Sequence, residues 1–158
     1  MVMFDSKKHG FTLLELIIVI IIVGLLATLG LTQYTKILEK GRIAEATANV
    51  TQLRKLANAY YLQNGTLLTV ANADLGVGTS AGMLPQDCNA SYFFRYGFDW
   101  PYEGQVNIWG YRCTSDGKSP NWGAGSYAVY ITVRPGVGDT AINCWAPDDS
   151  CAQVGLPH

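Results

Sequence analysis

The sequence predicts an α+β fold with a long N-terminal helix and a small antiparallel β-sheet. Two observations lead to this prediction. An apolar run near the N-terminus passes directly into a segment whose apolar residues recur every three or four positions, which is the spacing of one helix face. The second half of the chain holds short segments rich in aromatic and β-branched residues, separated by turn residues. A chain of 158 residues favours one domain with a small core.

Composition excludes several classes of function. The formal net charge is −1, from 11 basic and 12 acidic side chains, so there is no general reason to expect a nucleic-acid or acidic partner. The histidines are His9 and His158, which leaves the body of the chain without a histidine for a catalytic triad. Phosphate-binding glycine motifs are also absent from the sequence. We therefore expect no enzyme, no catalytic residue, no cofactor and no nucleic-acid partner.

The N-terminus combines basic residues with an apolar stretch that predicts a membrane-spanning helix. Lys7 and Lys8 precede this stretch, so the N-terminus should stay in the cytoplasm while the rest of the chain is exported. Phe11 to Leu31 has about the 20 residues that a bilayer-spanning helix needs. Gly10 is the small residue at the junction, and cleavage after it would keep the helix, unlike removal of a secretory signal peptide.

Glu15 is an ionisable residue within this apolar stretch. Such a carboxylate costs about 2.5–3.5 kcal/mol on membrane insertion and is normally paired. Cleavage between Gly10 and Phe11 would create an α-amino group one helical turn from Glu15, or opposite Glu15 of a neighbouring chain. Pairing between chains would drive assembly. The alternative is an ordinary single-pass anchor whose Glu15 reaches the membrane interface.

The run GFTLLE at residues 10–15, with two lysines before it, resembles the prepilin peptidase recognition and N-methylation motif of type IV pilins. The similarity extends to Tyr34, although many major pilins have a proline where this chain has Thr32. The resemblance implies cleavage after Gly10, N-methylation of Phe11, and a role for Glu15 in methylation and assembly. It also implies that the long helix packs on the antiparallel sheet.

The resemblance divides the chain into a cleaved leader, 1–10, a transmembrane and filament-core helix, 11–33, and a globular part, 34–158. It implies a structural subunit of a pilus-like filament, with adhesion, motility or a related surface function. The precursor would lie in the bacterial inner membrane and the product in an extracellular fibre. Implied partners are further copies of the chain, a prepilin peptidase with methyltransferase activity, an assembly platform, an ATPase and membrane lipid. The alternatives are a pseudopilin of a type II secretion system and a monomeric anchored binding module.

Beyond Tyr34 the helix is expected to continue and to become amphipathic. Its regularly spaced apolar residues are Ile43, Ala46, Val50, Leu53, Ala57 and Tyr60. The charged residues that mostly lie off this stripe are Lys36, Glu39, Lys40, Arg42, Glu45, Arg54 and Lys55. The pattern predicts one helix from about Phe11 to Leu62 or Gln63, half-buried against the globular part and ended by Asn64-Gly65.

The globular part is predicted to contain a loop and then a sheet. Residues 66 to 84 are rich in Gly, Ala, Thr and Asn and indicate a loop with one helical turn near Asn72 to Leu75. Strands are expected at Tyr92 to Phe94, Val106 to Cys113 and Tyr127 to Val133. The last of these alternates in character, as expected when one face packs on the helix.

Four cysteines lie in the second half of the chain: Cys88, Cys113, Cys144 and Cys151. They form no CxxC pair, so disulfides in an oxidising compartment are favoured over a zinc site, with free buried thiols as the alternative. Four cysteines allow three pairings. We favour Cys144 with Cys151, because short loops close readily, and Cys88 with Cys113 as the remaining pair.

Two further groups of residues are candidate binding sites. The carboxylates Asp139, Asp148 and Asp149 could hold calcium, but their spacing matches no EF-hand, so solvated loop carboxylates and no metal site are expected. The aromatic stretch between Tyr92 and Tyr102, with Arg95 inside it, could stack single-stranded nucleic acid. Because few basic residues lie nearby, packing in the core and between subunits is the favoured interpretation.

Overall fold

The computed structural model describes residues 10–100, 102, 104–115, 118–120, 126–148 and 150–156. The chain forms two compact units, Met1–Thr35 and Lys36–His158. The second unit, called the head below, contains the sheet and the hydrophobic core. The predicted α+β fold class is confirmed. The division into residues 1–10, 11–33 and 34–158 stays a prediction.

Helix α1 spans Leu13–Asn64, and its residues belong to both units. Its sequence contains no proline and is rich in Leu, Ile and Ala, so no residue interrupts the helix. At its end Gly65 has a φ of 73°, and its N–H donates to the carbonyl of Tyr61 at 2.7 Å. Glycine adopts this left-handed conformation without a Cβ clash, which makes it a good helix terminator. The predicted helix and its glycine stop are confirmed.

Within the head, one face of α1 packs into the core. The buried residues of this face are Ile43, Ala46, Val50, Leu53 and Ala57, and Tyr60 packs against them partly buried. These are the residues that the three- and four-residue spacing predicted. Burying a side chain such as Val or Leu completely contributes about 1.5–3 kcal/mol. This stripe is therefore the main apolar attachment of the helix to the head.

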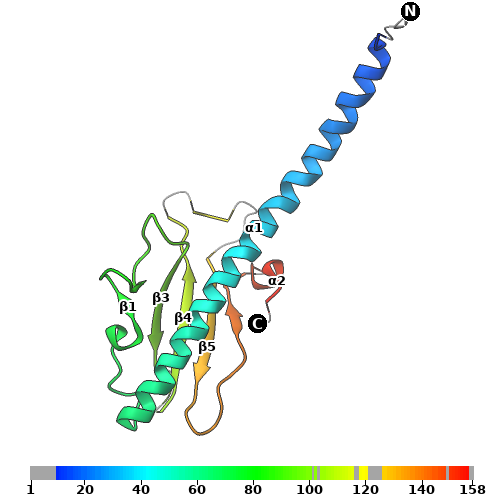
Figure 1. The fold of residues 1–158 in the computed structure, drawn as a ribbon. Helices are drawn as coiled ribbons and strands as arrows, with labels where there is room; N and C mark the ends of the chain where they lie inside the picture. Colours follow the sequence, from blue (N-terminus) through cyan, green and yellow to red (C-terminus); the bar gives the residue numbers. More distant parts are fainter. Residues whose placement is uncertain are drawn as a thin grey trace, which may run out of the picture. The chain divides into compact units, whose positions relative to one another are not determined.

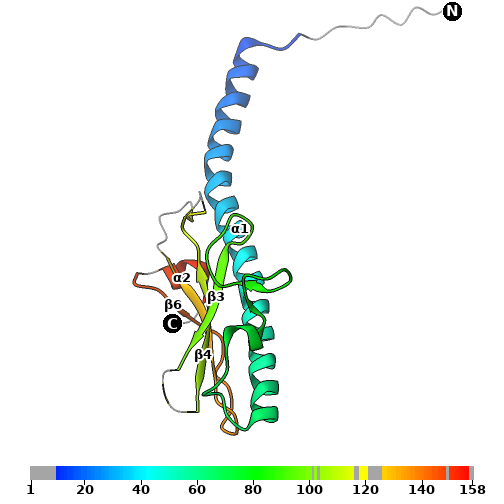
Figure 2. The same ribbon diagram turned by 90° about the vertical axis from the view of Figure 1, so that its left-hand side faces the viewer.

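Among the described residues, the main sheet has four strands: β3 Phe94–Asp99, β4 Val106–Arg112, β5 Ala128–Val133 and β6 Asn143–Trp145. They lie in the order β3-β4-β5-β6, and each neighbouring pair is antiparallel. The head part of α1 crosses one face of this sheet (Figure 1), and the second view shows helix and sheet as adjacent layers (Figure 2). The second and third predicted strands are confirmed. β6 was not predicted, because three residues carry too little alternation to be recognised.

The first predicted strand was misplaced. It was expected at Tyr92 to Phe94, but β3 begins at Phe94 and continues to Asp99. The carbonyl of Tyr92 accepts a hydrogen bond from Lys118 Nζ at 2.6 Å, so a side chain takes the place of a neighbouring strand there. Gly97 obscured the true strand in the sequence, because glycine is depleted in strands.

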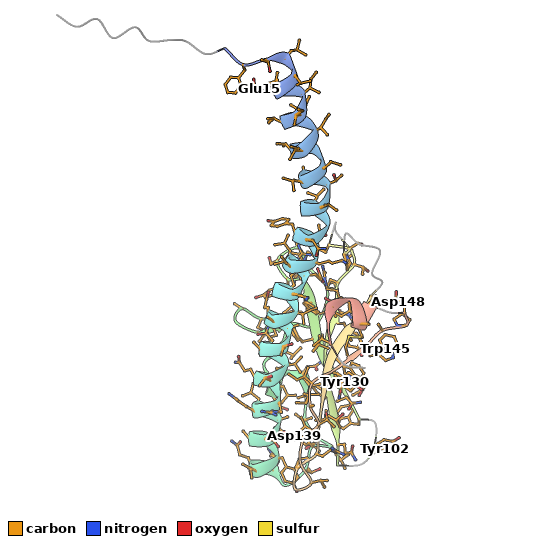
Figure 3. All side chains as sticks on the ribbon, turned by 90° about the vertical axis from the view of Figure 1, so that its right-hand side faces the viewer. Glu15, Tyr102, Tyr130, Asp139, Trp145 and Asp148 are labelled. Carbon is orange, nitrogen blue, oxygen red and sulfur yellow. A yellow bond between two sulfur atoms is a disulfide. The ribbon has the colours of Figure 1, made fainter. Side chains whose placement is uncertain are left out.

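The two faces of the sheet have different roles. On the face toward α1, Asn49 donates from Nδ2 to the hydroxyl of Tyr96 at 2.8 Å. Gly110 lies on this face, and a Cβ there would stand 3.4 Å from Val50 Cγ2, so glycine allows the close approach of helix and sheet. The opposite face carries the aromatic residues Trp109, Tyr111, Tyr130 and Trp145, of which the last two are labelled in Figure 3.

The segment between α1 and β3 contains three short elements: the 3-10 helix η1 Asn72–Leu75, β1 Val77–Gly78 and β2 Leu84–Pro85. β1 and β2 form a short parallel pair, and the helical turn predicted near Asn72 to Leu75 is confirmed. The segment contributes Leu67, Val70, Leu75 and Val77 to the core. The loop is therefore anchored by its apolar side chains.

Two disulfides cross-link the head. Cys88, in the loop before β3, bonds to Cys113, just after β4, with a Cα–Cα distance of 5.7 Å. Cys144 of β6 bonds to Cys151 of the short helix α2, Ser150–Val154, also at a Cα–Cα distance of 5.7 Å. Both pairs favoured from the sequence are present, and none of the four described cysteines is free.

Candidate functional site

The junction before the apolar helix is the first candidate site. Gly10, Phe11 and Thr12 precede α1 without regular secondary structure. Phe11 is 90% exposed, and Gly10 is exposed as well. The rest of the predicted leader, including Lys7 and Lys8, lies outside the described residues. The bond at which cleavage was predicted is therefore accessible and lies outside the helix.

Glu15 lies in the first turn of α1 (Figure 3). Its Oε2 accepts hydrogen bonds from the Thr12 N–H at 2.9 Å and the Thr12 hydroxyl at 2.8 Å. In return, the Glu15 N–H donates to Thr12 Oγ1 at 3.2 Å. This reciprocal pair is a capping box, which satisfies N–H groups that have no partner inside the helix. The pattern Thr-x-x-Glu before an apolar run is its sequence signature, but the box was not among the sequence predictions.

The capping box changes the question of what Glu15 pairs with. In the uncut chain its carboxylate already has a partner in Thr12, at a helix N-terminus where negative charge is favoured. The α-amino group of Phe11 exists only after the bond to Gly10 is cut. Pairing of Glu15 with that amino group therefore stays a prediction about the processed protein.

The apolar side chains of α1 from Leu13 to Leu31 are exposed in the single chain. Thr28 donates from Oγ1 to the carbonyl of Gly24 at 2.8 Å, so the helix itself satisfies this polar side chain. α1 is the one helix in the described part of the chain that is long and apolar enough to span a membrane. An apolar surface of this extent needs to be covered by lipid or by other protein chains.

Comparison with known proteins finds matches to the N-terminal segment of the chain. Residues 5–31 match the family model of the prokaryotic N-terminal methylation motif. The chain is also 35% identical, over 79 residues, to the type IV major pilin protein PilE of Neisseria gonorrhoeae; this covers 50% of the chain and 47% of the relative. In this segment the chain is similar to type IV pilins. The predicted resemblance is confirmed.

Two other relatives of this chain extend the comparison. A probable minor fimbrial protein of Dichelobacter nodosus is 41% identical over 67 residues, which are 42% of this chain and 41% of the relative. The type IV major pilin protein PilA of Myxococcus xanthus is 28% identical over 95 residues, which are 60% of this chain and 38% of the relative. The matches thus span less than half the length of each relative. Pilin relatives are structural subunits and not enzymes, in agreement with the prediction made for this chain. No solved structure matches this chain significantly.

The head contains a buried polar cluster that was not predicted. Glu39 was expected to lie off the buried stripe, but it is only 2% exposed, so this expectation was wrong. Arg112 of β4 donates to its carboxylate through Nε and, at 3.1 Å, through Nη2. The Tyr127 hydroxyl donates to it at 2.7 Å and Arg42 Nη1 at 2.9 Å. The cluster joins α1 to β4 through Arg112, and to the start of β5 through Tyr127, the residue directly before that strand.

Burial, hydrogen bonds and charges within this cluster shift the pKa values of Glu39 and Tyr127. Burial raises the pKa of Glu39, but hydrogen bonds from Arg112 and Tyr127 and the Arg112 charge outweigh burial, so its pKa lies below the ordinary value. Burial and the Glu39 carboxylate both raise the pKa of Tyr127, which keeps its hydroxyl a donor at neutral pH. Because both carboxylate oxygens have protein donors, the cluster is a structural joint and not a reactive site.

The loop carboxylates have partners within the protein. Asp139 accepts hydrogen bonds from Asn58 Nδ2 and from the Arg134 N–H, each at 3.1 Å. Asp148 accepts one from a backbone N–H at the start of α2 at 2.9 Å. Asp149 lies outside the described residues. In the part of the chain that is described, no three His, Cys, Asp or Glu residues are grouped to hold a metal ion.

The aromatic stretch before β4 divides between the core and the surface. Phe94 and Tyr96 are buried in the core, and burial raises the pKa of Tyr96 to about 12. Trp100 and Tyr102 at the other end are exposed. The stretch therefore presents no continuous row of open rings, and the interpretation as core packing is supported for Phe94 and Tyr96.

Proposed function

We propose that this protein is the structural subunit of a type IV pilus-like filament with an adhesive or motility function. The precursor is held in the bacterial inner membrane by residues 11–33, cut after Gly10 by a prepilin peptidase, and methylated at Phe11. A platform protein and an ATPase then move it into an extracellular fibre. The observation that carries the proposal is the exposed apolar surface of α1 directly after the methylation motif. The relatives named as pilins and fimbrial proteins favour a pilus over a secretion pseudopilus.

Apolar packing alone gives the helix little reason to leave the membrane. Lipid tails solvate Leu and Ile as well as neighbouring helices do, so burial in a fibre core adds little relative to the bilayer. An ionised Glu15 in the bilayer, by contrast, costs about 2.5–3.5 kcal/mol. A neighbour's Phe11 amino group would remove this cost in the fibre. Glu15 therefore favours assembly through charge pairing, in addition to capping α1 in the uncut chain.

Two variants separate the charge of Glu15 from its capping role. Glu15→Gln keeps a residue that can complete a capping box but removes the charge. Thr12→Ala removes the capping hydroxyl and keeps the charge. The measurement is the intact mass and N-terminal sequence of protein sheared from cells, with Glu45→Ala as the control for loss of an exposed carboxylate on the same helix.

The proposal expects sheared protein that starts at N-methylated Phe11 in the parent, in Thr12→Ala and in Glu45→Ala. Glu15→Gln should remain in the membrane fraction. Normal fibres from Glu15→Gln would refute the charge mechanism. Processed parent protein found only in the cell envelope would favour the pseudopilin, and uncut protein beginning at Met1 would refute processing altogether.

A further inference from the structure

The outer face of the sheet contains a hollow that the filament role does not use. It lies along the edge strand β3, has a volume of about 310 Å³, and is open to solvent. Its walls come from four separate segments: Asn72 in η1, Gln86 and Asp87 after β2, residues of β3, and residues of β4. This volume lies at the lower end of the roughly 300–1,000 Å³ that is typical of ligand pockets.

Stacked aromatic rings form the wall of the hollow on β4. Trp109 stacks on Tyr130 of β5 with ring centroids 4.4 Å apart, and on Tyr111 at 5.5 Å. The guanidinium of Arg95 lies over the Tyr111 ring at 4.5 Å. These side chains hold one another in place, so the wall is rigid before any ligand arrives. A rigid wall reduces the entropy lost on binding.

Gly97 keeps the hollow open beside this wall. It is paired with Trp109 across β3 and β4, so its missing side chain leaves space directly next to the indole ring. A Cβ added at Gly97 meets no atom within 4 Å. Its φ is not in the left-handed region, so the backbone does not require glycine there. The space is therefore a property of the surface and can be filled without disturbing the strand.

The polar groups around the hollow decide which ligand fits. One cation, Arg95, faces two carboxylates, Asp87 and Asp99, so a polyanion such as nucleic acid or a sulfated glycan would be repelled. A purely apolar partner would remove water from these carboxylates without replacing their hydrogen bonds. In the described residues, neither carboxylate is held in a salt bridge, and both can accept hydrogen bonds.

A neutral sugar meets both requirements of such a site. Its hydroxyl groups donate to carboxylates, and its apolar C–H groups pack against the side chains of Trp109 and Tyr111 that line the hollow. The amides of Asn72 and Gln86, joined by a hydrogen bond of 3.2 Å, add donors and acceptors at the rim. We propose that the hollow between β3, β4 and the loop of η1 binds a neutral oligosaccharide.

The test uses the full chain in micelles of a detergent without a sugar head group, because maltoside or glucoside detergents would compete. Maltohexaose, cellohexaose, mannohexaose and chitohexaose serve as neutral probes, and a heparin hexasaccharide serves as the anionic probe. Binding is measured by isothermal titration calorimetry and by tryptophan fluorescence. Since assembly is not involved, the result does not depend on whether the protein forms filaments.

Gly97→Val is the decisive variant, because it fills the hollow with a residue that strands favour. Asp99→Asn removes one carboxylate with almost no change in shape. Ala141→Val, at an exposed position outside the lining of the hollow, is the matched control for an added apolar side chain. We expect at least one neutral probe to bind, Gly97→Val to weaken it by about tenfold or more, Asp99→Asn to weaken it less, and Ala141→Val to leave it unchanged.

Three outcomes would overturn the proposal. The first is that none of the neutral probes binds at millimolar concentration. The second is that a neutral probe binds Gly97→Val as tightly as it binds the parent protein. The third is that the heparin fragment binds more tightly than every neutral probe. The urea unfolding midpoint of each variant, followed by tryptophan fluorescence, is measured alongside. A Gly97→Val protein that unfolds at the parent's midpoint but has lost the sugar supports the site, because misfolding cannot then explain the loss.

Discussion

Replacing Glu39 by glutamine tests whether the buried cluster holds the helix to the sheet. The exchange keeps the shape of the side chain but removes its charge and turns one acceptor into a donor. The new NH₂ group would then face donors from Arg112, Tyr127 or Arg42. Arg112 would stay buried as an unpaired cation with the backbone carbonyl of Cys113, 2.6 Å from Nη1, among its remaining acceptors.

The expected loss is large because the pair is buried on both sides. The Arg112 side chain is 0% exposed and that of Glu39 is 2% exposed, so water cannot replace the lost partner. Breaking a buried ion pair by removing one partner costs about 3–5 kcal/mol in the free energy of unfolding. Because Arg112 keeps other acceptors, the expected loss in the free energy of unfolding lies near the lower end of this range, at about 3 kcal/mol.

Urea unfolding of the full chain in micelles measures this loss. The four tryptophans of the sequence all follow residue 99, so their fluorescence reports on the head and not on the apolar part of α1. Glu45→Gln, an exposed carboxylate on the same helix, should change the free energy of unfolding by no more than about 0.5 kcal/mol. A double variant with Arg112→Met should lose about 2 kcal/mol less than the sum of the two single variants.

The reasoning is refuted if Glu39→Gln loses less than about 1 kcal/mol, the value of an ordinary hydrogen bond. The pH dependence provides a second check. Because the folded protein lowers the pKa of Glu39, its stabilising contribution is complete above the unfolded pKa of about 4.3 and is lost as the pH falls through the folded value. The difference in stability between parent and Glu39→Gln should therefore shrink below about pH 4.

Further predictions concern the disulfides and one glycine of the sheet. Opening Cys88–Cys113 by serine substitution should lower the free energy of unfolding by about 3.5 kcal/mol, and opening Cys144–Cys151 by about 2.4 kcal/mol, since the separations are 25 and 7 residues. Equal losses in urea unfolding would contradict this order. Gly110→Val should cost about 1–3 kcal/mol, because even its Cβ would lie 3.2 Å from a buried ring. Gly97→Val, which adds the same side chain on the open face of the sheet, is the control for Gly110→Val. Equal urea unfolding midpoints for these two variants would contradict the packing argument.

The sequence was most informative where the relevant residues are neighbours in the chain. The helix, its glycine stop and its buried stripe follow from spacing along one element. The favoured disulfides are also present, one of them across a separation of only 7 residues. The capping box of Thr12 and Glu15 was equally local, and the pattern Thr-x-x-Glu could have revealed it. Predictions failed at β3 and β6, where a glycine and a short length weakened the local signal.

By itself, the sequence determined that this protein has a pilin-type N-terminus, because membrane insertion and a linear processing motif depend on contiguous residues. Only the tertiary structure decided that Glu39 is buried, because its partner Arg112 is 73 residues away. The same holds for the hollow on the outer face of the sheet, whose walls come from four segments brought together by strand pairing and by the packing of the loop before β3. A spacing pattern reports which side of an element is apolar, but the partner of a polar group depends on packing between elements.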